Sequence, residues 1–408
     1  MEEFTLKNGI KVIFNKTDGV EVVSVKVFTP VSVISETEEN AGISGLTARM
    51  MIKSTKNRSN EILARDTDDI GAYLSSDADY DMAGLNMSFL SEYFDKAAEI
   101  LADVTVNPAF DASELEVEKE NTYAALKARK DSIGKTASDG FLENFYEKSP
   151  YAFIVLGKEE SLKKITPEDL SVWHKYSYNA SNILISIAGN IDKKTIINSL
   201  EKYFGVVESG KKFEKTVLAA DEGKREKIKI KGKFNQAYIF TGFNAPELKD
   251  EDFVAIKVMN AVLGGRMTSR LFVELREKLG LAYEVGAIYP SRVRGSFFAI
   301  YIGLDKKNID LTLEKIDEIL QDICTNKISE QELKDTKTYI KGIYIMDRQT
   351  VGKQSYYYGW REIVGQGYRY EEKYLEDIDK ISIDDINKAA NRIFKQKPLT
   401  VIIEPDEK

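Results

Sequence analysis

The chain contains an internal duplication, which restricts it to folds built from two similar halves. Three segments of the first half return in the same order 216 to 219 residues later: Glu99–Val104 (EILADV) as Glu318–Ile323 (EILQDI), Asp111–Leu115 as Ser329–Leu333, and Lys164–Thr166 as Lys380–Ser382. Matches that keep their order and nearly keep their spacing indicate duplication.

The repeated segments carry the start signals of helices. Asp111 and Ser329 are each followed three residues later by Glu, and Thr166 and Ser382 are each followed three residues later by Asp. A short polar residue with an acidic residue three positions on is the pattern of a capping box, which satisfies free amides at a helix N-terminus. Each half is therefore expected to contain helices that begin at matching positions.

Apolar runs bounded by turn residues predict strands in both halves. Asn8-Gly9 within Phe4–Phe14 predicts a hairpin with a type I′ turn. Further strands are expected at Val22–Phe28, Leu85–Phe89, Ile183–Ala188, Ala237–Phe243, Phe297–Ile302 and Leu399–Ile403. Short turns favour antiparallel pairing, so the expected fold class is α+β, with two homologous half-domains that are each an antiparallel sheet covered by helices.

The two halves are expected to be separate domains. Residues 208–226 are rich in Lys, Glu and Gly and lack apolar periodicity, which is typical of a solvated linker. The sequence therefore predicts an N-terminal α+β repeat over residues 1–207, a linker over 208–226 and a C-terminal α+β repeat over 227–408. Each half is long enough to bury a core of its own.

The chain has one Cys and one His; His174 is expected to be structural or on the surface, and Cys324 is expected to be a buried small apolar residue. A lone Cys excludes an intramolecular disulfide and a Cys-based zinc site, and a lone His excludes the two-His sites typical of zinc hydrolases. No segment has the spacing of a calcium loop. Catalysis by this chain alone is therefore not expected.

Charge and hydropathy exclude two further classes of protein. There are 58 Lys and Arg against 66 Asp and Glu, a formal charge of −8, whereas a nucleic-acid binder carries a basic domain. The longest apolar stretch, Phe297–Leu304, is far shorter than the ~18–20 residues that span a bilayer. The acidic start, Met1-Glu2-Glu3, lacks the pattern of a signal peptide. We expect a soluble chain that binds no nucleic acid, and the sequence leaves its compartment open.

Several segments, taken in order, resemble the insulinase-type (pitrilysin-like) zinc peptidases. They are Asn40–Met50 (NAGISGLTARM), Ile62–Leu74 (ILARDTDDIGAYL), Ser149–Tyr151 with Gly157–Ser161, Tyr178–Gly189, Leu263–Phe272 (LGGRMTSRLF) and Arg276–Tyr283 (REKLGLAY). The likeness covers nearly the whole chain. It implies the duplicated α+β fold of that family, which agrees with the internal repeat.

The sequence departs from this family at the catalytic zinc site. Gly45 and Arg49 stand in place of the two His of the family's H-x-x-E-H motif, and Ala48 stands in place of its Glu. The third ligand of the family is a Glu seven residues after an acidic anchor; with Glu118 as the anchor, that position is Ala125. Zinc needs three protein donors and an open position for water, and a guanidinium would repel it. No catalytic residue and no metal ligand is expected in this chain.

A second feature of the family is present as Arg276 and Tyr283. Helix signals run from Thr268 to Leu279 and Gly280 is a suitable stop, so Arg276 is expected in the last helical turn and Tyr283 on the next strand. Both side chains donate hydrogen bonds suited to a peptide carbonyl. In the family this pair holds the substrate backbone opposite the zinc, and the resemblance implies the same substrate-binding role here.

Two-chain members of the family divide these tasks between a subunit with zinc and a subunit with the Arg/Tyr pair, and this sequence resembles the second. The first hypothesis is a non-catalytic, substrate-binding subunit of a heterodimeric zinc endopeptidase. It would hold an extended peptide or unfolded protein and have no cofactor of its own, because a homologous partner subunit would carry the zinc. The alternatives are a pseudopeptidase scaffold and a stand-alone peptide-binding homodimer without proteolytic activity.

Overall fold

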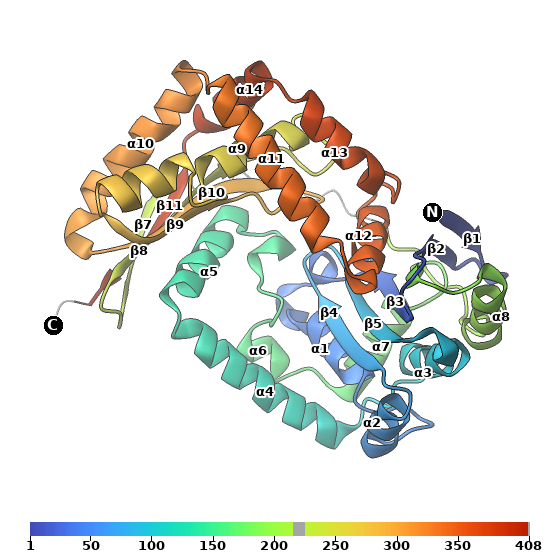
Figure 1. Ribbon diagram of the computed structural model, residues 1–408. Helices are drawn as coiled ribbons and strands as arrows, with labels where there is room; N and C mark the ends of the chain where they lie inside the picture. The colour runs from blue at the N-terminus through green and yellow to red at the C-terminus, as the bar shows by residue number, and fades with distance from the viewer. Residues whose placement is uncertain (215–224, 407–408) are drawn as a thin grey trace. The chain divides into compact units, whose positions relative to one another are not determined.

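The computed structural model describes residues 1–214 and 225–406 and forms two compact units, each described here by itself (Figure 1). Unit 1 comprises Met1–Leu126, Phe153–Thr216 and Met346–Glu371, and unit 2 comprises Lys127–Ala152, Val217–Ile345 and Glu372–Lys408. Within the described residues, no helix is both long enough and apolar enough to cross a membrane.

The compact units do not coincide with the halves of the sequence. Residues 127–152 of the first half belong to unit 2, and residues 346–371 of the second half belong to unit 1. The boundaries 1–207 and 227–408 follow the sequence repeat, whereas the fold exchanges one segment in each direction. Of the expected linker over 208–226, residues 215–224 lie outside the described residues, and residues 208–214 form no helix or strand.

Unit 1 is built on a six-stranded sheet with helices on both faces. The strand order is β1 (Glu2–Thr5), β2 (Lys11–Lys16), β6 (Leu184–Gly189), β3 (Val22–Thr29), β5 (Ala83–Leu90) and β4 (Tyr73–Ala78). Five helices lie on one side of the sheet: α1 (Ile43–Met51), α2 (Asn60–Asp68), α3 (Phe94–Val106), α7 (Pro167–Ser177) and α8 (Lys193–Phe204). The exchanged helix α12 (Val351–Ile363) packs on the other face, against β3 and β6. The alternation of β3 explains this arrangement, because Val23, Val25 and Val27 enter the main core while Phe28 faces Tyr356 of α12.

Unit 2 repeats this arrangement on a five-stranded sheet. The strand order is β7 (Lys227–Gly232), β11 (Leu399–Pro405), β8 (Ala237–Asn244), β10 (Phe297–Leu304) and β9 (Ala282–Ile288). One face carries α9 (Phe253–Leu263), α10 (Ile309–Thr325) and α14 (Ile383–Phe394), and the other carries the exchanged helix α5 (Ile133–Tyr146) (Figure 1). The remaining helices are α4 (Ala112–Lys130), α6 (Glu159–Leu162), α11 (Glu330–Asp347) and α13 (Tyr370–Lys380).

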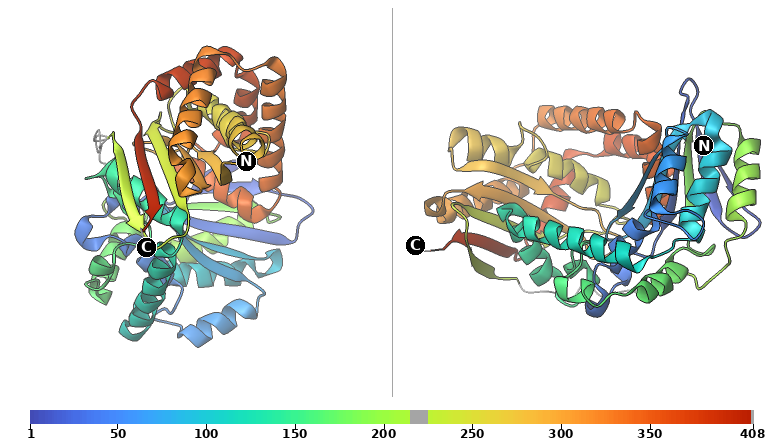
Figure 2. Two further views of the ribbon diagram at one scale, coloured as in Figure 1. Left: turned by 90° about the vertical axis from the view of Figure 1, so that its left-hand side faces the viewer. Right: turned by 90° about the horizontal axis from the view of Figure 1, so that it is seen from below.

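The two sheets share one topology, which confirms the α+β duplication. The order β2-β6-β3-β5-β4 corresponds strand for strand to β7-β11-β8-β10-β9, and β1 is an addition. The expectation of purely antiparallel sheets is wrong at one pair in each sheet, because β2 pairs parallel with β6 and β7 pairs parallel with β11. Parallel pairing needs a long crossover connection, which each half supplies between these strands. Figure 2 shows the red strand β11 between two yellow-green strands, β7 and β8.

The first hairpin forms as expected, but its turn type differs. Strands β1 and β2 pair antiparallel, with Thr5 opposite Lys11. A type I′ turn needs positive φ at both central residues, whereas only Gly9 has it, at 94°. The Asn8 side-chain amide instead donates to two backbone carbonyls that follow α8, those of Phe204 (2.8 Å) and Val207 (3.0 Å). These bonds hold Asn8 in the tight connection without the left-handed conformation.

The expected helix starts form at all four positions. Thr166 and Ser382 head complete capping boxes, and both their side chains accept from the backbone amide three residues on. At Asp111 the side chain caps the amide of Glu114 (3.2 Å), and at Ser329 the side chain caps that of Glu332 (3.1 Å).

The two glutamates that follow Asp111 and Ser329 do not complete capping boxes but contact other side chains. Glu114 accepts a hydrogen bond from the hydroxyl of Ser54, and Glu332 forms a bidentate pair with Arg270 (both 2.9 Å). Ser54 and Arg270 are 216 residues apart, the spacing of the repeat. The duplicated helices are therefore tied to their units at equivalent points.

The lone histidine is structural. His174 on α7 is buried, its Nε2–H donates to the carbonyl of Thr105 (2.8 Å), and its ring contacts those of Phe110 and Tyr178. Burial lowers the pKa of His174 to about 4. The imidazole is therefore neutral in the folded chain near pH 7.

We expect acid to destabilise the fold through His174. Its pKa is about 4 in the folded chain and about 6.5 when exposed, so the unfolded chain binds the proton more tightly. The stabilising contribution is complete above about pH 6.5 and is lost as pH falls toward 4, by up to about 3 kcal/mol. Urea unfolding from pH 7.5 to 4.5 should show this slope in the wild type and a shallower one in His174→Gln; identical slopes would contradict the assignment.

Candidate functional site

Arg276 and Tyr283 lie on the short connection that leads into β9. Residues Phe272–Lys278 form a π-helical turn rather than the end of an α-helix, and the Leu279 amide donates to the carbonyl of Glu274 (3.1 Å). Gly280 has φ of 60°, so the expected stop at this glycine is confirmed. A π-turn is a rare local widening of a helix that occurs often at functional sites. It replaces the regular last turn expected around Arg276.

Arg276 is exposed, and no described residue neutralises its charge. Its guanidinium lies 4.9 Å from the centroid of the Phe272 ring, a cation–π contact that orients the side chain. No carboxylate or carbonyl of residues 1–214 or 225–406 pairs with it. The five N–H donors of the guanidinium are therefore available to a ligand.

Tyr283 occupies a β-bulge at the start of edge strand β9. Ala282 lies opposite Leu304 and Glu284 lies opposite Gly303, so Tyr283 is the extra residue. Its ring covers Gly303: a Cβ added there would lie 2.2 Å from Cζ of Tyr283. The absence of a side chain at Gly303 thus leaves room for the ring, which packs against the backbone there.

The hydroxyl of Tyr283 is free to donate. The side chain is 41% exposed, and its oxygen has no hydrogen-bond partner within the described residues. Partial burial and the negative charge of Glu284 raise the pKa of Tyr283, so the phenol keeps its proton near neutral pH. Arg276 and Tyr283 are thus two exposed donors without partners, at the two ends of one helix–glycine–strand connection.

The residues at the family's zinc positions lie on two helices of unit 1 that face each other. Arg49 on α1 contacts Glu118 on α4, with Nε 2.6 Å from Oε1, and it also donates to the hydroxyl of Thr122 (3.0 Å). Lys53 approaches the other oxygen of Glu118 at 3.2 Å. A buried carboxylate therefore has a cation on each of its two oxygens.

These side chains do not fit a zinc ion. Ala48 and Ala125 have no donor atom, and a Cβ added at Gly45 would lie 3.1 Å from Nη1 of Arg49. The guanidinium of Arg49 thus occupies the room that a ligand at position 45 would need. Glu118 is committed to two cations, and zinc would be repelled by both. No group of three or more His, Cys, Asp or Glu residues within residues 1–214 and 225–406 is arranged to hold a metal.

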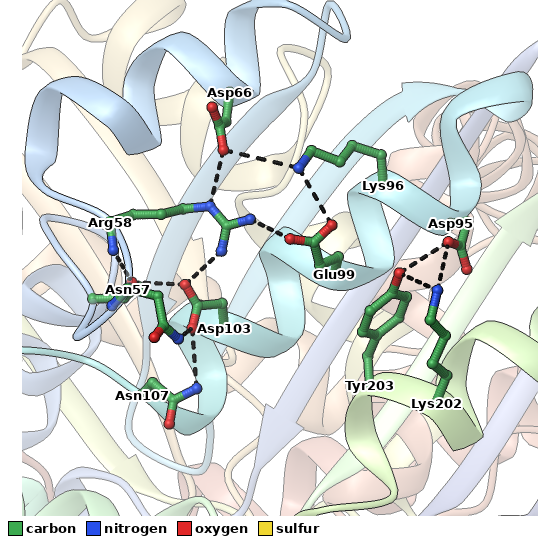
Figure 3. Close-up of polar contacts among 11 residues, drawn as sticks. Asn57, Arg58, Asp66, Asp95, Lys96, Glu99, Asp103, Asn107, Lys202 and Tyr203 are labelled. Carbon is green, nitrogen blue, oxygen red and sulfur yellow. Dashed lines mark hydrogen bonds and ion pairs between the residues drawn. The ribbon is translucent and has the colours of Figure 1, made fainter.

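A pocket of about 410 Å³ in unit 1 is lined by a different set of residues, several of which Figure 3 shows with their polar contacts. It is formed by α2, α3 and the end of α8, and Arg58 is at its centre. The Arg58 guanidinium pairs with Asp66 (3.0 Å), Glu99 and Asp103 (2.6 Å), and Lys96 also approaches Glu99 (3.3 Å). The charged side chains of this group are therefore partnered by one another.

The Asp103 carboxylate accepts four hydrogen bonds in this pocket. Besides Arg58, it accepts from Thr55 (2.7 Å), Asn57 (2.6 Å) and Asn107 (3.0 Å). Burial acts to raise the pKa of Asp103, but these bonds outweigh it and the pKa is lowered. This arrangement is typical of a structural network, and we assign the pocket to stability rather than to ligand binding.

The sequence interpretation did not include Arg58, although the internal repeat contains a signal for it. Asp103 is the fifth residue of the repeated segment Glu99–Val104, and its counterpart Asp322 is the fifth residue of Glu318–Ile323. The structure pairs each of these aspartates with an arginine, Asp103 with Arg58 and Asp322 with Arg270 (2.7 Å). An aspartate at the same position of both duplicated helices is therefore the sequence signal for an arginine partner in each half.

Comparison with known proteins identifies the family of this chain. Residues 11–159 match the insulinase family (peptidase family M16), and residues 164–340 match the peptidase M16 inactive domain. The uncharacterized zinc protease YmxG of Bacillus subtilis is 27% identical over 405 residues, covering 99% of this chain and 98% of the relative. The non-peptidase homolog YmxG of Helicobacter pylori is 24% identical over 374 residues, covering 90% and 85%.

Two solved structures share the fold. A protease from Helicobacter pylori superposes with a TM-score of 0.92 at 20% identity and 99% coverage of both chains. A peptidase M16 inactive domain from Pseudomonas fluorescens gives a TM-score of 0.92 at 21% identity, covering 100% of this chain and 98% of that one. At these identities the likeness concerns the fold alone. The family matches, together with Gly45, Ala48 and Arg49 at the motif positions, show that this chain belongs to the insulinase family (peptidase family M16) as an inactive-type member without the H-x-x-E-H motif.

Proposed function

We propose that this chain is the non-catalytic, substrate-binding subunit of a heterodimeric zinc endopeptidase. The proposal is supported by two sites in the same chain: one has free hydrogen-bond donors, and the other has lost its zinc ligands. Arg276 and Tyr283 are exposed donors without partners among the described residues, whereas the zinc positions hold the Arg49–Glu118 ion pair. A chain with these properties has the groups to bind a peptide carbonyl and lacks the groups to activate water.

In the proposed mechanism the peptide lies extended between the subunits. A sheet edge of the partner subunit would take up its backbone by strand addition, which leaves alternate carbonyls facing this chain. Arg276 contributes a charged N–H fork and Tyr283 a neutral phenol to one such carbonyl, which orients it and polarises it. The zinc, held by the partner, would supply the water that attacks.

The alternatives are a pseudopeptidase scaffold and a stand-alone peptide-binding homodimer. The name of the Helicobacter pylori relative, a non-peptidase homolog, agrees with all three roles, because none requires hydrolysis by this chain. The scaffold needs no peptide binding, and the homodimer needs no partner with zinc. The exposure of Arg276 and Tyr283 favours a role in binding peptide.

Purification of the tagged full chain from its native cells tests the proposal. We expect a second chain of similar length to co-purify, to carry the H-x-x-E-H motif with one zinc, and to cleave unstructured peptides faster in the presence of this chain. A complex without zinc or cleavage would indicate a scaffold. A dimer of this chain alone that binds peptide would indicate the homodimer, and either result would overturn the proposal.

A further inference from the structure

Three tyrosines, one of them Tyr283, and one glutamate lie together on one face of the unit 2 sheet. Gly303 of β10 pairs with Tyr238 of β8 on one side and with Glu284 of β9 on the other, so these two side chains flank the glycine on one face. Tyr301 lies two residues before Gly303 on the same strand and therefore faces the same way. Because Tyr283 lies over Gly303, its ring joins them. We call Tyr238, Tyr283, Glu284 and Tyr301 the tyrosine–glutamate cluster.

Two glycines make room for this cluster. A Cβ added at Gly303 would lie 2.2 Å from Cζ of Tyr283, and one added at Gly286 would lie 2.4 Å from Oη of Tyr301. Any larger residue at either position would displace a tyrosine ring. The rings are therefore held against bare backbone, with little freedom to move.

Glu284 interacts with all three tyrosines. Tyr238 is almost fully buried, and this burial together with the nearby Glu284 carboxylate raises the pKa of its phenol. Burial first, and the negative charge of Glu284 second, raise the pKa of Tyr283 and that of Tyr301. The carboxylate thus lies close enough to each phenol for its negative charge to raise the pKa of that phenol.

Glu284 has no paired cation among the residues that the structure describes. Its side chain is exposed, and no Lys or Arg of residues 1–214 or 225–406 forms an ion pair with it. Two other glutamates of unit 2 do have one: Glu274 pairs with Lys278 (2.9 Å) and Glu332 pairs with Arg270 (2.9 Å). A carboxylate without a counter-ion beside aromatic rings has the chemistry that binds an ammonium or guanidinium group, by an ion pair and by cation–π contact.

We infer that the tyrosine–glutamate cluster binds a Lys or Arg side chain of the peptide, so that this chain selects substrates with a basic residue near the carbonyl held by Arg276 and Tyr283. The inference rests on the proposed function, because Tyr283 belongs to both groups. It adds a chemical preference to that function: an extended segment with a positive charge next to the bound carbonyl.

Binding of matched peptides to the purified full chain tests the inference. Two unstructured peptides, both acetylated at the N-terminus, differ only in one central Lys or norleucine. We expect the wild type to bind the Lys peptide about tenfold more tightly, which corresponds to roughly 1.4 kcal/mol. Glu284→Gln keeps the size of the side chain but removes its charge, so it should bind both peptides with the affinity that the wild type has for the norleucine peptide.

Two controls separate this inference from the proposed function. Glu277→Gln removes an exposed charge from the π-helical turn and should keep the preference for Lys. Arg276→Ala should weaken both peptides equally and leave their ratio unchanged. Equal binding of both peptides by the wild type, or a preference that survives Glu284→Gln, would overturn this inference alone, whereas binding of neither peptide would remove the proposed function with it.

The amino group of a peptide is a second source of positive charge. A third peptide, with norleucine and a free N-terminus, tests for it. We expect it to bind like the acetylated norleucine peptide. The free amino group alone could instead give the tenfold tighter binding, and Glu284→Gln could abolish it. In that case the cluster binds chain ends and the assignment to basic side chains is wrong.

Discussion

Arg276→Ala is expected to lower kcat/KM of the proposed two-chain peptidase by roughly 10- to 150-fold. A charged hydrogen bond to a substrate carbonyl contributes about 1.5–3 kcal/mol, and its loss in the transition state appears in kcat/KM. The guanidinium has no partner within the described residues, so its removal leaves no buried group unpaired and should not disturb the fold. Steady-state cleavage of an unstructured peptide, with both subunits present, measures the effect.

Two further variants make this experiment specific. Tyr283→Phe removes one hydroxyl and keeps the ring that covers Gly303, so it should lower kcat/KM as well. Lys278→Ala removes a cation from the same π-helical turn that is paired with Glu274, and it should have little effect. Size-exclusion mass should show that all three variants still associate with the partner. Wild-type kinetics in both Arg276→Ala and Tyr283→Phe would remove the substrate-binding role.

Arg58→Ala is expected to destabilise the protein by about 3–5 kcal/mol, the largest effect on stability that we predict. Removal of one partner of a buried ion pair leaves the other as an uncompensated charge. Here the charge left behind is that of Asp103, which is 6% exposed, together with two further carboxylates that Arg58 neutralises (Figure 3). Urea unfolding at neutral pH, monitored by circular dichroism, measures the change.

Arg65→Ala is the matched control for this variant. Arg65 lies on α2 near the same pocket, but it is exposed and forms no ion pair within the described residues. Its loss should change the free energy of unfolding by less than about 0.5 kcal/mol. A loss below about 1 kcal/mol in Arg58→Ala would show that the network contributes little, and the pocket would then be open to another interpretation.

Much of the fold could be predicted because local signals and tertiary structure agree. Besides the first hairpin, six strands were expected, and all six form within two residues of their expected ends. Each is an apolar run that enters a core. β4 and β7 were not predicted: the sequence YLSSDA of β4 is largely polar, and lysines alternate along KIKIKG of β7. Both strands lie at sheet edges, where one side needs no apolar residues and lysine protects against aggregation.

Features that depend on distant contacts were not accessible from the sequence. The exchange of residues 127–152 and 346–371 between the halves leaves no local trace, because α5 and α12 have the same helical pattern whichever sheet they cover. The π-helical turn at Arg276 has no recognised sequence signal, and the expected α-helix differs from it by one hydrogen-bond register. The position of the pair on a helix–glycine–strand connection was nevertheless predicted, because Gly280 marks the turn.

The family resemblance predicted which residues to compare at the zinc positions, and the structure adds what replaced them. The sequence shows that Gly45, Ala48 and Ala125 have no ligand atoms. It does not show that Arg49 and Lys53 both pair with Glu118, because these contacts join helices that are far apart in the chain. The cluster around Glu284 was also missed, since only the register of three strands brings its tyrosines together.

In the proposed complex this polypeptide contributes contacts to a substrate but no metal and no activated water. Zinc analysis of the purified full chain after dialysis, combined with a peptide-hydrolysis assay on the same sample, tests it most directly. We expect much less than one zinc per chain and no hydrolysis until the partner subunit is added. One tightly held zinc per chain, with hydrolysis in the absence of any second protein, would contradict the account.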